Sequence, residues 1–191
     1  MKERQIKNIE KDLLGPLFGY FVKNGLENIS IRDICKNIDV SSGSLYYWFK
    51  GKDEIIYSTI NYGMIESIKK LFDFAYDEIA NPMAFLENIL SEVDKCKDEF
   101  RFVFQVTTSP KFGPRIRESS LAYKTEYDKC CEIFSQILNC DIDYIRRMVY
   151  SLVFIIEDYI IWEDLETTKM QLAFLAKNLI DHMESSKNKG N

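Results

Sequence analysis

Small hydroxyl side chains, a glycine and a run of aromatic rings lie close together in the stretch SSGSLYYWFKGK, which spans Ser41 to Lys52. Hydroxyl groups donate and accept hydrogen bonds, and the rings of tyrosine and tryptophan combine flat apolar faces with polar tips. A glycine lets the backbone approach a ligand closely, and lysines attract anions. The combination predicts a surface that contacts a polyanion.

Residues for other kinds of chemistry are scarce in this chain. His182 is the only histidine, and general acid–base catalysis would have to depend on scattered carboxylates. The five cysteines are an odd number without CxxC spacing, so neither a disulfide framework nor a zinc site is expected. We therefore expect no enzymatic activity, no metal and no cofactor. Most cysteines should be buried apolar residues, although Cys130, Cys131 and Cys140 are candidates for oxidant sensing.

Charge is distributed unevenly along the chain. The total is −5, which by itself argues against nucleic acid as a partner. Residues 1–52, however, contain nine lysines and arginines against six acidic residues, a net charge of +3, which leaves −8 for the remainder. A basic head on an acidic body can bind phosphate while the body avoids nonspecific adhesion to DNA.

Composition indicates a globular, mainly helical protein. Hydrophobic residues make up 46% of the chain and charged residues 29%, and the low counts of 8 Gly and 4 Pro favour long helices. The charged N-terminus lacks the apolar core of a signal peptide. The longest apolar run, near residues 149–162, is interrupted by Glu157 and Asp158 and is too short to span a bilayer. We therefore expect a cytoplasmic protein.

Apolar periodicity and helix caps predict an all-α fold of about nine helices. Pro16 should kink the first helix or loosen its first turns, and Gly25 should end it. The segment from Thr107 to Pro114 is the clearest break in the body, and the tail SSKNKGN should fray. The expected helices cover about residues 4–24, 30–38, 42–49, 52–79, 82–93, 98–106, 116–138, 141–166 and, from Thr167 or Thr168, up to about 184.

Two short helices joined by a tight turn are expected between residues 30 and 49. Ser30 begins the first helix with Asp33 three residues later, which is the arrangement of a capping box. Asp39 lies in the turn, and Ser41 caps the second helix. The apolar residues that should lock the two helices together include Ile34, Val40, Leu45 and Phe49.

The sequence from Gly25 to Ile55 resembles the DNA-binding domain of the TetR family of transcriptional regulators. The resemblance covers about the first 55 residues and is most specific in VSSGSLYYWF and the following Lys52. The family usually has Ala where this chain has Cys35, and Ala-Gly where it has Ile38-Asp39. Asp39 must then adopt a glycine-like conformation, which aspartate tolerates better than most residues.

A recognition helix of this kind enters the major groove, where its leading residues meet the edges of the bases. Gly43 permits close approach, while Ser42 and Ser44 can hydrogen-bond to bases or phosphates. Few of these side chains donate in a bidentate manner, so tyrosine contacts and DNA shape should supply much of the specificity.

The resemblance further implies that Tyr46 and Lys52 hold the DNA backbone and that Arg32 reads a guanine. The structural alternative is that part of the aromatic run belongs to the core, Phe49 above all. The expected DNA-binding residues are Ser30, Arg32, Ser41, Ser42, Gly43, Ser44, Tyr46, Tyr47, Trp48 and Lys52.

A single domain of this size offers too little interface for tight DNA binding, so a homodimer is expected. The segment from Val149 to Trp162 is apolar on almost all sides and must be covered on more than one face. Two helices from each chain would form a four-helix interface, as is usual in the family; the alternative is that they fill the chain's own core. The expected interface residues are Val149, Leu152, Val153, Ile156, Ile160, Leu172, Leu175, Leu179 and Met183.

The many aromatic residues of the body can enclose a pocket for an apolar or aromatic small molecule. In the family, occupancy of such a pocket moves the long fourth helix and changes the spacing of the DNA-binding heads. A carboxylate in the pocket would select a cation, although the simpler interpretation places the two acidic residues in solvent or at the dimer rim. The expected ligand-binding residues are Phe104, Tyr123, Tyr127, Phe154, Glu157 and Asp158.

These expectations define a protein with a helix-turn-helix DNA-binding domain in residues 1–52 and a ligand-binding and dimerisation domain in residues 53–191. It should be a ligand-responsive regulator, more often a repressor, on a palindromic operator, with heads about 34–36 Å apart. Two alternatives stay open: an activator of the same fold, and a helical protein-interaction module whose DNA motif has degenerated at Asp39.

Overall fold

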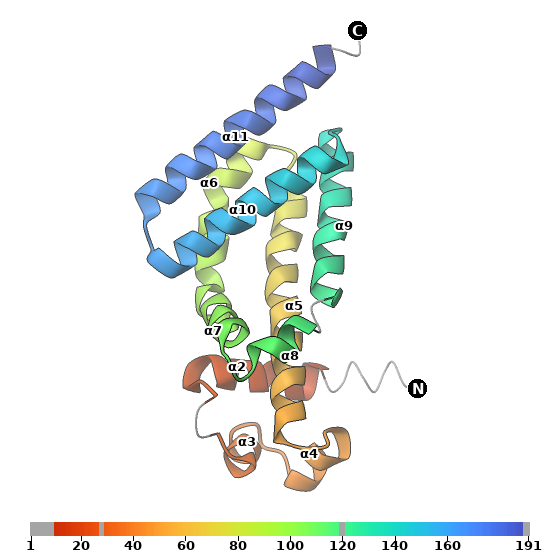
Figure 1. Ribbon diagram of the computed structural model, residues 1–191, viewed down its shortest axis with the longest axis vertical. Helices are drawn as coiled ribbons and strands as arrows, with labels where there is room; N and C mark the ends of the chain where they lie inside the picture. The colour runs from red at the N-terminus through yellow and green to blue at the C-terminus, as the bar shows by residue number, and fades with distance from the viewer. Residues whose placement is uncertain (1–9, 27–28, 119–120, 189–191) are drawn as a thin grey trace. The chain divides into compact units, whose positions relative to one another are not determined.

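The computed structural model describes residues 10–26, 29–118 and 121–188, and every regular element in these ranges is a helix (Figure 1). The expected all-α fold is confirmed. This part of the chain has ten α-helices and a π-helical turn rather than nine helices, chiefly because two helices, α8 and α9, replace one expected long helix. The elements are η1 (Glu10–Leu14), α2 (Gly15–Asn24), α3 (Ile31–Asn37), α4 (Ser42–Trp48), α5 (Lys52–Glu78), α6 (Pro82–Lys95), α7 (Lys97–Thr108), α8 (Gly113–Glu118), α9 (Leu121–Leu138), α10 (Ile142–Trp162) and α11 (Leu165–Asn188).

The N-terminal helical segment is irregular where Pro16 enters it. The π-helical turn η1 ends at Leu14, and Pro16 lies in the first turn of α2. Proline has no backbone N–H to donate, so the regular hydrogen-bond pattern changes at this point. Gly25 has φ 69° and donates its N–H to the carbonyl oxygen of Phe21 at 2.8 Å, which ends α2 as expected. Residues 1–9 of the expected first helix lie outside the described ranges.

The ends of α3 and α4 are held by the side chains that the sequence indicates. Ser30 Oγ accepts a hydrogen bond from the N–H of Asp33, and the Asp33 carboxylate accepts one from the N–H of Ser30, each at 3.1 Å. Asp39 has φ 52°, the left-handed conformation expected for an aspartate in a glycine position. Ser41 Oγ accepts from the N–H of Ser44 at 3.0 Å. The capping box, the turn and the second cap are therefore confirmed.

The described residues belong to two compact units. The first unit comprises Met1–Ser67 and Asp98–Ser120, and the second comprises Ile68–Lys97 and Leu121–Asn191. Helix α5 passes from the first unit into the second, and nearly all of α7 and the whole of α8 belong with α3 and α4 in the first unit. This grouping reflects packing; the functional boundary after Lys52 remains a prediction.

In the first unit, a glycine allows α2 to pack closely on α5. A Cβ atom at Gly63 would lie only 2.1 Å from Cδ2 of the Phe18 ring, well inside van der Waals contact. The Phe18 ring in turn packs edge-to-face on Phe102 of α7, with 5.9 Å between ring centroids. Ser67 donates a hydrogen bond of 2.7 Å to Glu99, which joins α5 to α7. These contacts join α2, α5 and α7 within the first unit.

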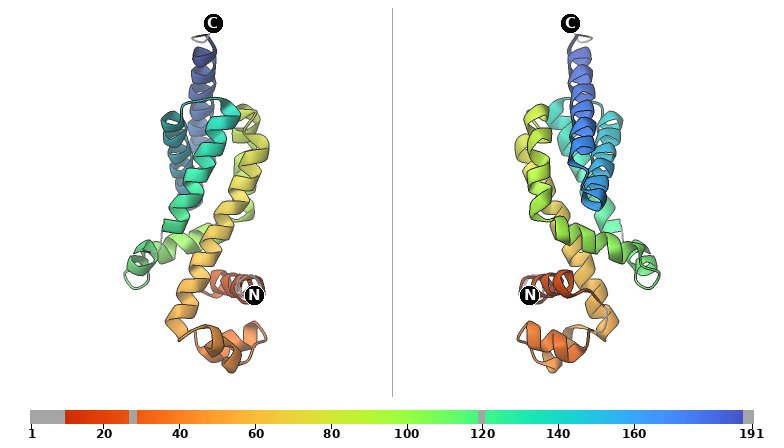
Figure 2. Two further views of the ribbon diagram at one scale, coloured as in Figure 1. Left: turned by 90° about the vertical axis from the view of Figure 1, so that its right-hand side faces the viewer. Right: turned by 90° about the vertical axis from the view of Figure 1, so that its left-hand side faces the viewer.

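In the second unit, α10 and α11 lie side by side, and they also pack on α9 and α6 respectively (Figures 1 and 2). Tyr144 of α10 stacks on His182 of α11, with 3.6 Å between ring centroids, and its hydroxyl donates to the carbonyl oxygen of Asn178. The inner sides of both helices are therefore covered within the same chain.

The limits of the last two helices differ from those expected. Asp141 caps α10 as predicted, but the helix ends at Trp162 rather than near residue 166, because Glu163 adopts a left-handed conformation with φ 56°. Helix α11 then begins at Leu165, before Thr167, since Asp164 accepts hydrogen bonds from both the N–H and the hydroxyl of Thr167. These bonds hold the pKa of the Asp164 carboxyl below its ordinary value. The helix also continues to Asn188, into the tail expected to fray.

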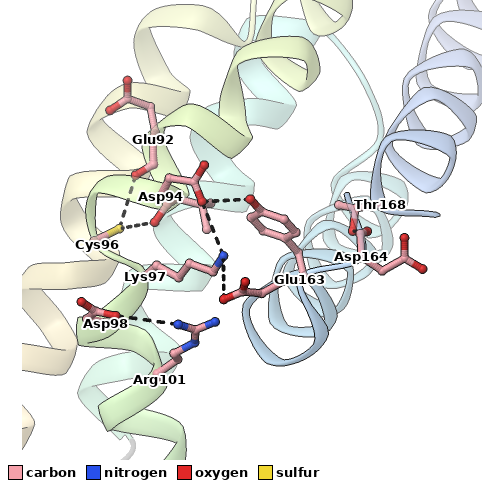
Figure 3. A network of polar contacts seen from close by, with 11 residues as sticks. Glu92, Asp94, Cys96, Lys97, Asp98, Arg101, Glu163, Asp164 and Thr168 are labelled. Carbon is pink, nitrogen blue, oxygen red and sulfur yellow. Dashed lines mark hydrogen bonds and ion pairs between the residues drawn. The ribbon is translucent and has the colours of Figure 1, made fainter. Parts of the chain in front are cut away.

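A group of polar contacts ties the end of α6 to the end of α10 in the second unit (Figure 3). Lys97 Nζ lies 3.8 Å from Asp94 Oδ1 and 3.3 Å from Glu163 Oε1, and it stands 4.5 Å from the centroid of the Tyr159 ring. The Tyr159 hydroxyl donates to Asp94 at 2.9 Å. The Lys97 side chain is only 16% exposed, so these partners compensate for the loss of hydration of its charge.

Among the described helices, none combines the length and the apolar character needed to cross a membrane.

Candidate nucleic-acid interface

Helix α4 has one buried side and one exposed side. Leu45 is fully buried and Phe49, which follows the helix, is 6% exposed, so these two residues attach the helix to the first unit. Tyr46, Tyr47 and Trp48 are 55%, 75% and 38% exposed. Large aromatic side chains are usually buried in a folded protein. A group of exposed rings on a short, well-anchored helix therefore indicates a binding surface.

The serines and the glycine at the start of α4 are also exposed, but two of the hydroxyls already form hydrogen bonds within the protein. Ser41 Oγ caps the helix, and it lies 2.9 Å from Ser44 Oγ. Ser42 and Gly43 are exposed, and a Cβ atom at Gly43 would meet only Ser41 Oγ, at 3.7 Å. The backbone at Gly43 is therefore accessible to a ligand, as expected.

The remaining expected DNA-binding residues lie at helix starts in the same unit. The Ser30 hydroxyl belongs to the capping box, and its hydrogen bonds hold the pKa of the Asp33 carboxyl below its ordinary value. Arg32 is exposed in the first turn of α3. Lys52 is half-buried in the first turn of α5, where Glu54 accepts a hydrogen bond from the backbone N–H of Lys50. The structure thus brings all ten expected residues into the first unit, and their contacts with DNA remain predictions.

Sequence reasoning missed one basic side chain near these residues. Arg115 of α8 lines an open hollow together with Lys50 and Lys52. No local pattern connects position 115 with position 52; the only signal is the basic composition of the segment SPKFGPRIR, which holds Lys111, Arg115 and Arg117.

The expected ligand-binding residues have different surroundings within their own units. Phe154 is 67% exposed, so its side chain is not enclosed within this chain. Tyr127 is buried and lies against Phe72 and Tyr150, with ring centroids 5.1 and 6.2 Å away. Phe104 lies in the first unit, in contact with Phe100. The side chain of Tyr123 lies outside the described residues.

The two acidic residues of α10, Glu157 and Asp158, are half-buried. Burial raises the pKa of the Glu157 carboxyl above its ordinary value. An apolar cavity of about 30 Å³ does occur in the second unit, but none of the five expected residues with described side chains lines it. Its lining residues include Phe85, Phe134, Met148, Leu152 and Leu175.

Most of the expected dimer-interface residues face the chain's own core. Six of the nine are buried, because they pack between α10, α11 and their neighbours in the second unit: Val149, Ile156, Ile160, Leu172, Leu175 and Leu179. Leu152, Val153 and Met183 are half-buried. In this chain the buried six contribute to the core of the second unit. The large apolar residues that are exposed on these helices are Tyr150, Phe154, Ile161, Trp162, Leu165, Met170 and Phe174.

The three cysteine candidates for oxidant sensing, Cys130, Cys131 and Cys140, are buried. Burial raises the pKa of each thiol. Since the thiolate is the reactive form, this environment disfavours oxidant sensing and fits a packing role.

The capped helix-turn-helix and its exposed second helix have the arrangement found in helix-turn-helix DNA-binding proteins. Residues 19–58 match the family described as "Bacterial regulatory proteins, tetR family". This match identifies a TetR-type helix-turn-helix domain in that segment of the chain.

One relative and two solved structures are similar to the chain beyond this segment, and the solved structures show the same fold. The chain is 20% identical over 131 residues to YuxN, an HTH-type transcriptional regulator of Bacillus subtilis (strain 168); the match covers 69% of this chain and 42% of YuxN. A transcriptional regulator of the "TerR/AcrR family" from Aquifex aeolicus VF5 has the same fold, with a TM-score of 0.54, 20% identity and coverage of 92% of this chain and 97% of that one. A TetR transcription regulator from Haloarcula marismortui ATCC 43049 has a TM-score of 0.54 at 15% identity, covering 94% and 98% of the two chains.

Proposed function

We propose that the protein binds an inverted-repeat operator as a homodimer, acts as a repressor there, and is released by a small molecule. The observation that supports DNA binding most directly is the exposed face of α4, which combines Gly43, Tyr46 and Tyr47 next to Lys52. A protein-interaction module with a degenerate DNA motif is less consistent with the structure, because Asp39 adopts the turn conformation and the motif keeps its geometry.

Groove chemistry assigns different tasks to these residues. The tyrosine rings can contact thymine methyl groups, and their hydroxyls can reach phosphates. Lys52 attracts phosphate as a point charge and contributes affinity that does not depend on sequence. Few bidentate base contacts are available on α4, so DNA shape should account for part of the specificity.

Selection from a pool of random DNA duplexes tests the proposal. The protein should enrich an inverted repeat whose half-sites lie about one helical turn apart or a similar successive-groove distance. Titration of the enriched duplex against random DNA, at several salt concentrations, then measures the preference. Equal affinity for both DNAs at every salt concentration would reject DNA reading as the function.

Pairing of two chains is proposed through the outer face of α10 and α11. Tyr150, Phe154 and Ile161 are exposed on α10 at spacings of four and seven residues, which places them on one side of the helix. Met170 and Phe174 are exposed on the adjacent α11, again four residues apart. An exposed apolar surface of this kind favours association with a like surface, and a four-helix interface would result.

Release by a small molecule would act through the helices of the second unit. The apolar cavity of about 30 Å³ in the second unit has room for about one water molecule, so a larger ligand would require its helices to move apart. Titration calorimetry with a cationic dye checks whether charge selects the ligand. Glu157→Gln and Asp158→Asn should weaken dye binding if a carboxylate faces the site, and unchanged affinity in both variants would remove that idea.

A further inference from the structure

An open hollow lies in the first unit at the start of α5. It has a volume of about 480 Å³ and is lined by Lys50, Gly51, Lys52, Asp53, Glu54 and Arg115. Five of these residues are consecutive in the sequence. Arg115 comes from α8, far along the chain, and folding brings it to the hollow.

Aromatic contacts hold the Arg115 side chain over α5. Its guanidinium carbon is 4.1 Å from the centroid of the Tyr57 ring, a cation–π distance. The Tyr57 ring packs edge-to-face on Phe112, with 6.1 Å between centroids. Tyr57 lies on α5 just after Lys52, so the packing places a basic group from α8 beside the expected phosphate-binding lysine.

The local charge of the hollow is positive despite two carboxylates. Three cationic side chains, Lys50, Lys52 and Arg115, line it with Asp53 and Glu54. The Glu54 carboxylate accepts a hydrogen bond of 2.5 Å from the backbone N–H of Lys50. This bond stabilises the chain just before α5 begins. The Asp53 carboxylate is exposed to solvent, which screens it.

We infer that Arg115 is a further DNA-backbone contact, which binds a phosphate beside the one held by Lys52; this inference rests on the proposed DNA-binding function. A guanidinium has five N–H donors in a planar fork, so it can keep a protein neighbour and bind phosphate oxygens at the same time. Its stacking on Tyr57 fixes the fork in advance, which lowers the entropy cost of the contact. The DNA-binding surface then extends beyond the helix-turn-helix to α8, and the added contact orients the protein without reading bases.

The salt dependence of binding tests this inference. The probe is the duplex enriched by selection, and affinity is measured by fluorescence anisotropy between about 50 and 200 mM salt. Arg115→Gln should weaken binding about threefold to tenfold and reduce the slope of log affinity against log salt by about 0.9, the value for one phosphate. Arg115→Lys should keep the slope and recover part of the affinity. Arg147→Gln, which removes one exposed positive charge from the second unit, should change neither quantity.

Each alternative outcome has a distinct reading. If Arg115→Gln binds with wild-type affinity and slope while Lys52→Gln weakens binding, the inference is overturned and the proposed function stands. If Arg115→Gln and Arg115→Lys lose equal affinity with an unchanged slope, the residue is structural and the inference is likewise overturned. If the wild-type protein enriches no duplex at all, the proposed function itself fails. Thermal unfolding followed by circular dichroism shows that the variants are folded at the temperature of the measurement.

Discussion

Some side chains at α4 cap the helix or anchor it in the first unit, whereas others are exposed to solvent. Ser41 and Ser44 hydrogen-bond at its N-terminus, and Leu45 anchors it in the unit. Tyr46 and Tyr47 are largely exposed. Because the two hydroxyls are engaged in the cap, the tyrosines and the accessible backbone at Gly43 are the stronger candidates for contact with DNA.

Tyr46→Ala and Lys52→Ala should both weaken binding to the enriched duplex. Loss of the tyrosine should cost about 1–2 kcal/mol at every salt concentration, whereas loss of the lysine should also make the salt dependence shallower by about 0.9 in the double-logarithmic slope. Fluorescence anisotropy over a salt series separates the two effects. Lys169→Ala in the second unit is the charge control and should behave like the wild type. Identical slopes for Lys52→Ala and the wild type would contradict a phosphate contact.

Glu157 predicts a pH-dependent effect on stability. Burial raises its pKa in the folded state, so the ionised form is less favourable there than in the unfolded chain. Below the ordinary glutamate pKa of 4.5 both states are protonated and no penalty arises. As the pH rises, the unfolded state ionises first, and the folded state loses stability until the pH exceeds the raised pKa. Glu157→Gln should therefore melt at a higher temperature than the wild type at pH 7 but not at pH 4, and an equal difference at both pH values would contradict this assignment.

Among the helices, α5 has the strictest packing requirement. Phe18 of α2 lies against its backbone at Gly63, and no side chain at this position fits without displacing the ring. The same ring packs on Phe102 of α7, so one glycine determines how three helices of the first unit meet. Lys52 lies at the start of the same helix, so a displacement of α5 caused by a side chain at position 63 would also affect the position of Lys52.

Gly63→Ala should destabilise the protein by about 1–3 kcal/mol, the usual cost of overpacking, although alanine is the better helix former. Gly19→Ala is the matched control, since nothing lies within 4 Å of a Cβ atom at that position of α2. It should be neutral or stabilising by up to about 1 kcal/mol. Denaturant unfolding measures both variants. Equal stability of the two would show that Phe18 moves aside without cost.

For the molecule as a whole, the outer face of α10 and α11 should determine the oligomeric state. Phe154 and Phe174 are 67% and 70% exposed, and burying a phenylalanine side chain contributes about 1.5–3 kcal/mol. The exchange of both residues for glutamate should therefore convert a dimer into a monomer, since four carboxylates would face each other across a symmetric interface.

Sedimentation velocity or light scattering after gel filtration measures the mass. Ile137→Glu, at an exposed apolar residue of α9, is the control and should remain a dimer. A wild-type protein with the mass of one chain at micromolar concentration would reject pairing through this face.

Local interactions explain why much of the fold, and the caps and turn of the helix-turn-helix, were predictable. The capping box at Ser30, the cap at Ser41 and the left-handed Asp39 each depend on residues within a few positions of one another. Apolar periodicity likewise predicted α5 and α6 close to their observed limits. The end of α10 was misplaced because the conformation of Glu163 left no clear mark in the sequence.

The sequence by itself determined that the chain is helical and that residues 30–52 form a TetR-type DNA-binding motif, because spacing along one chain encodes helices, caps and a tight turn. Tertiary structure alone decided which sides of α10 and α11 are covered, since a helix that is apolar all round does not indicate which face its own chain will use. It also decided that α8 joins the unit of the DNA-binding helices and brings Arg115 to Lys52. Contacts of this kind join residues far apart in the chain, and they arise only when whole helices pack against one another.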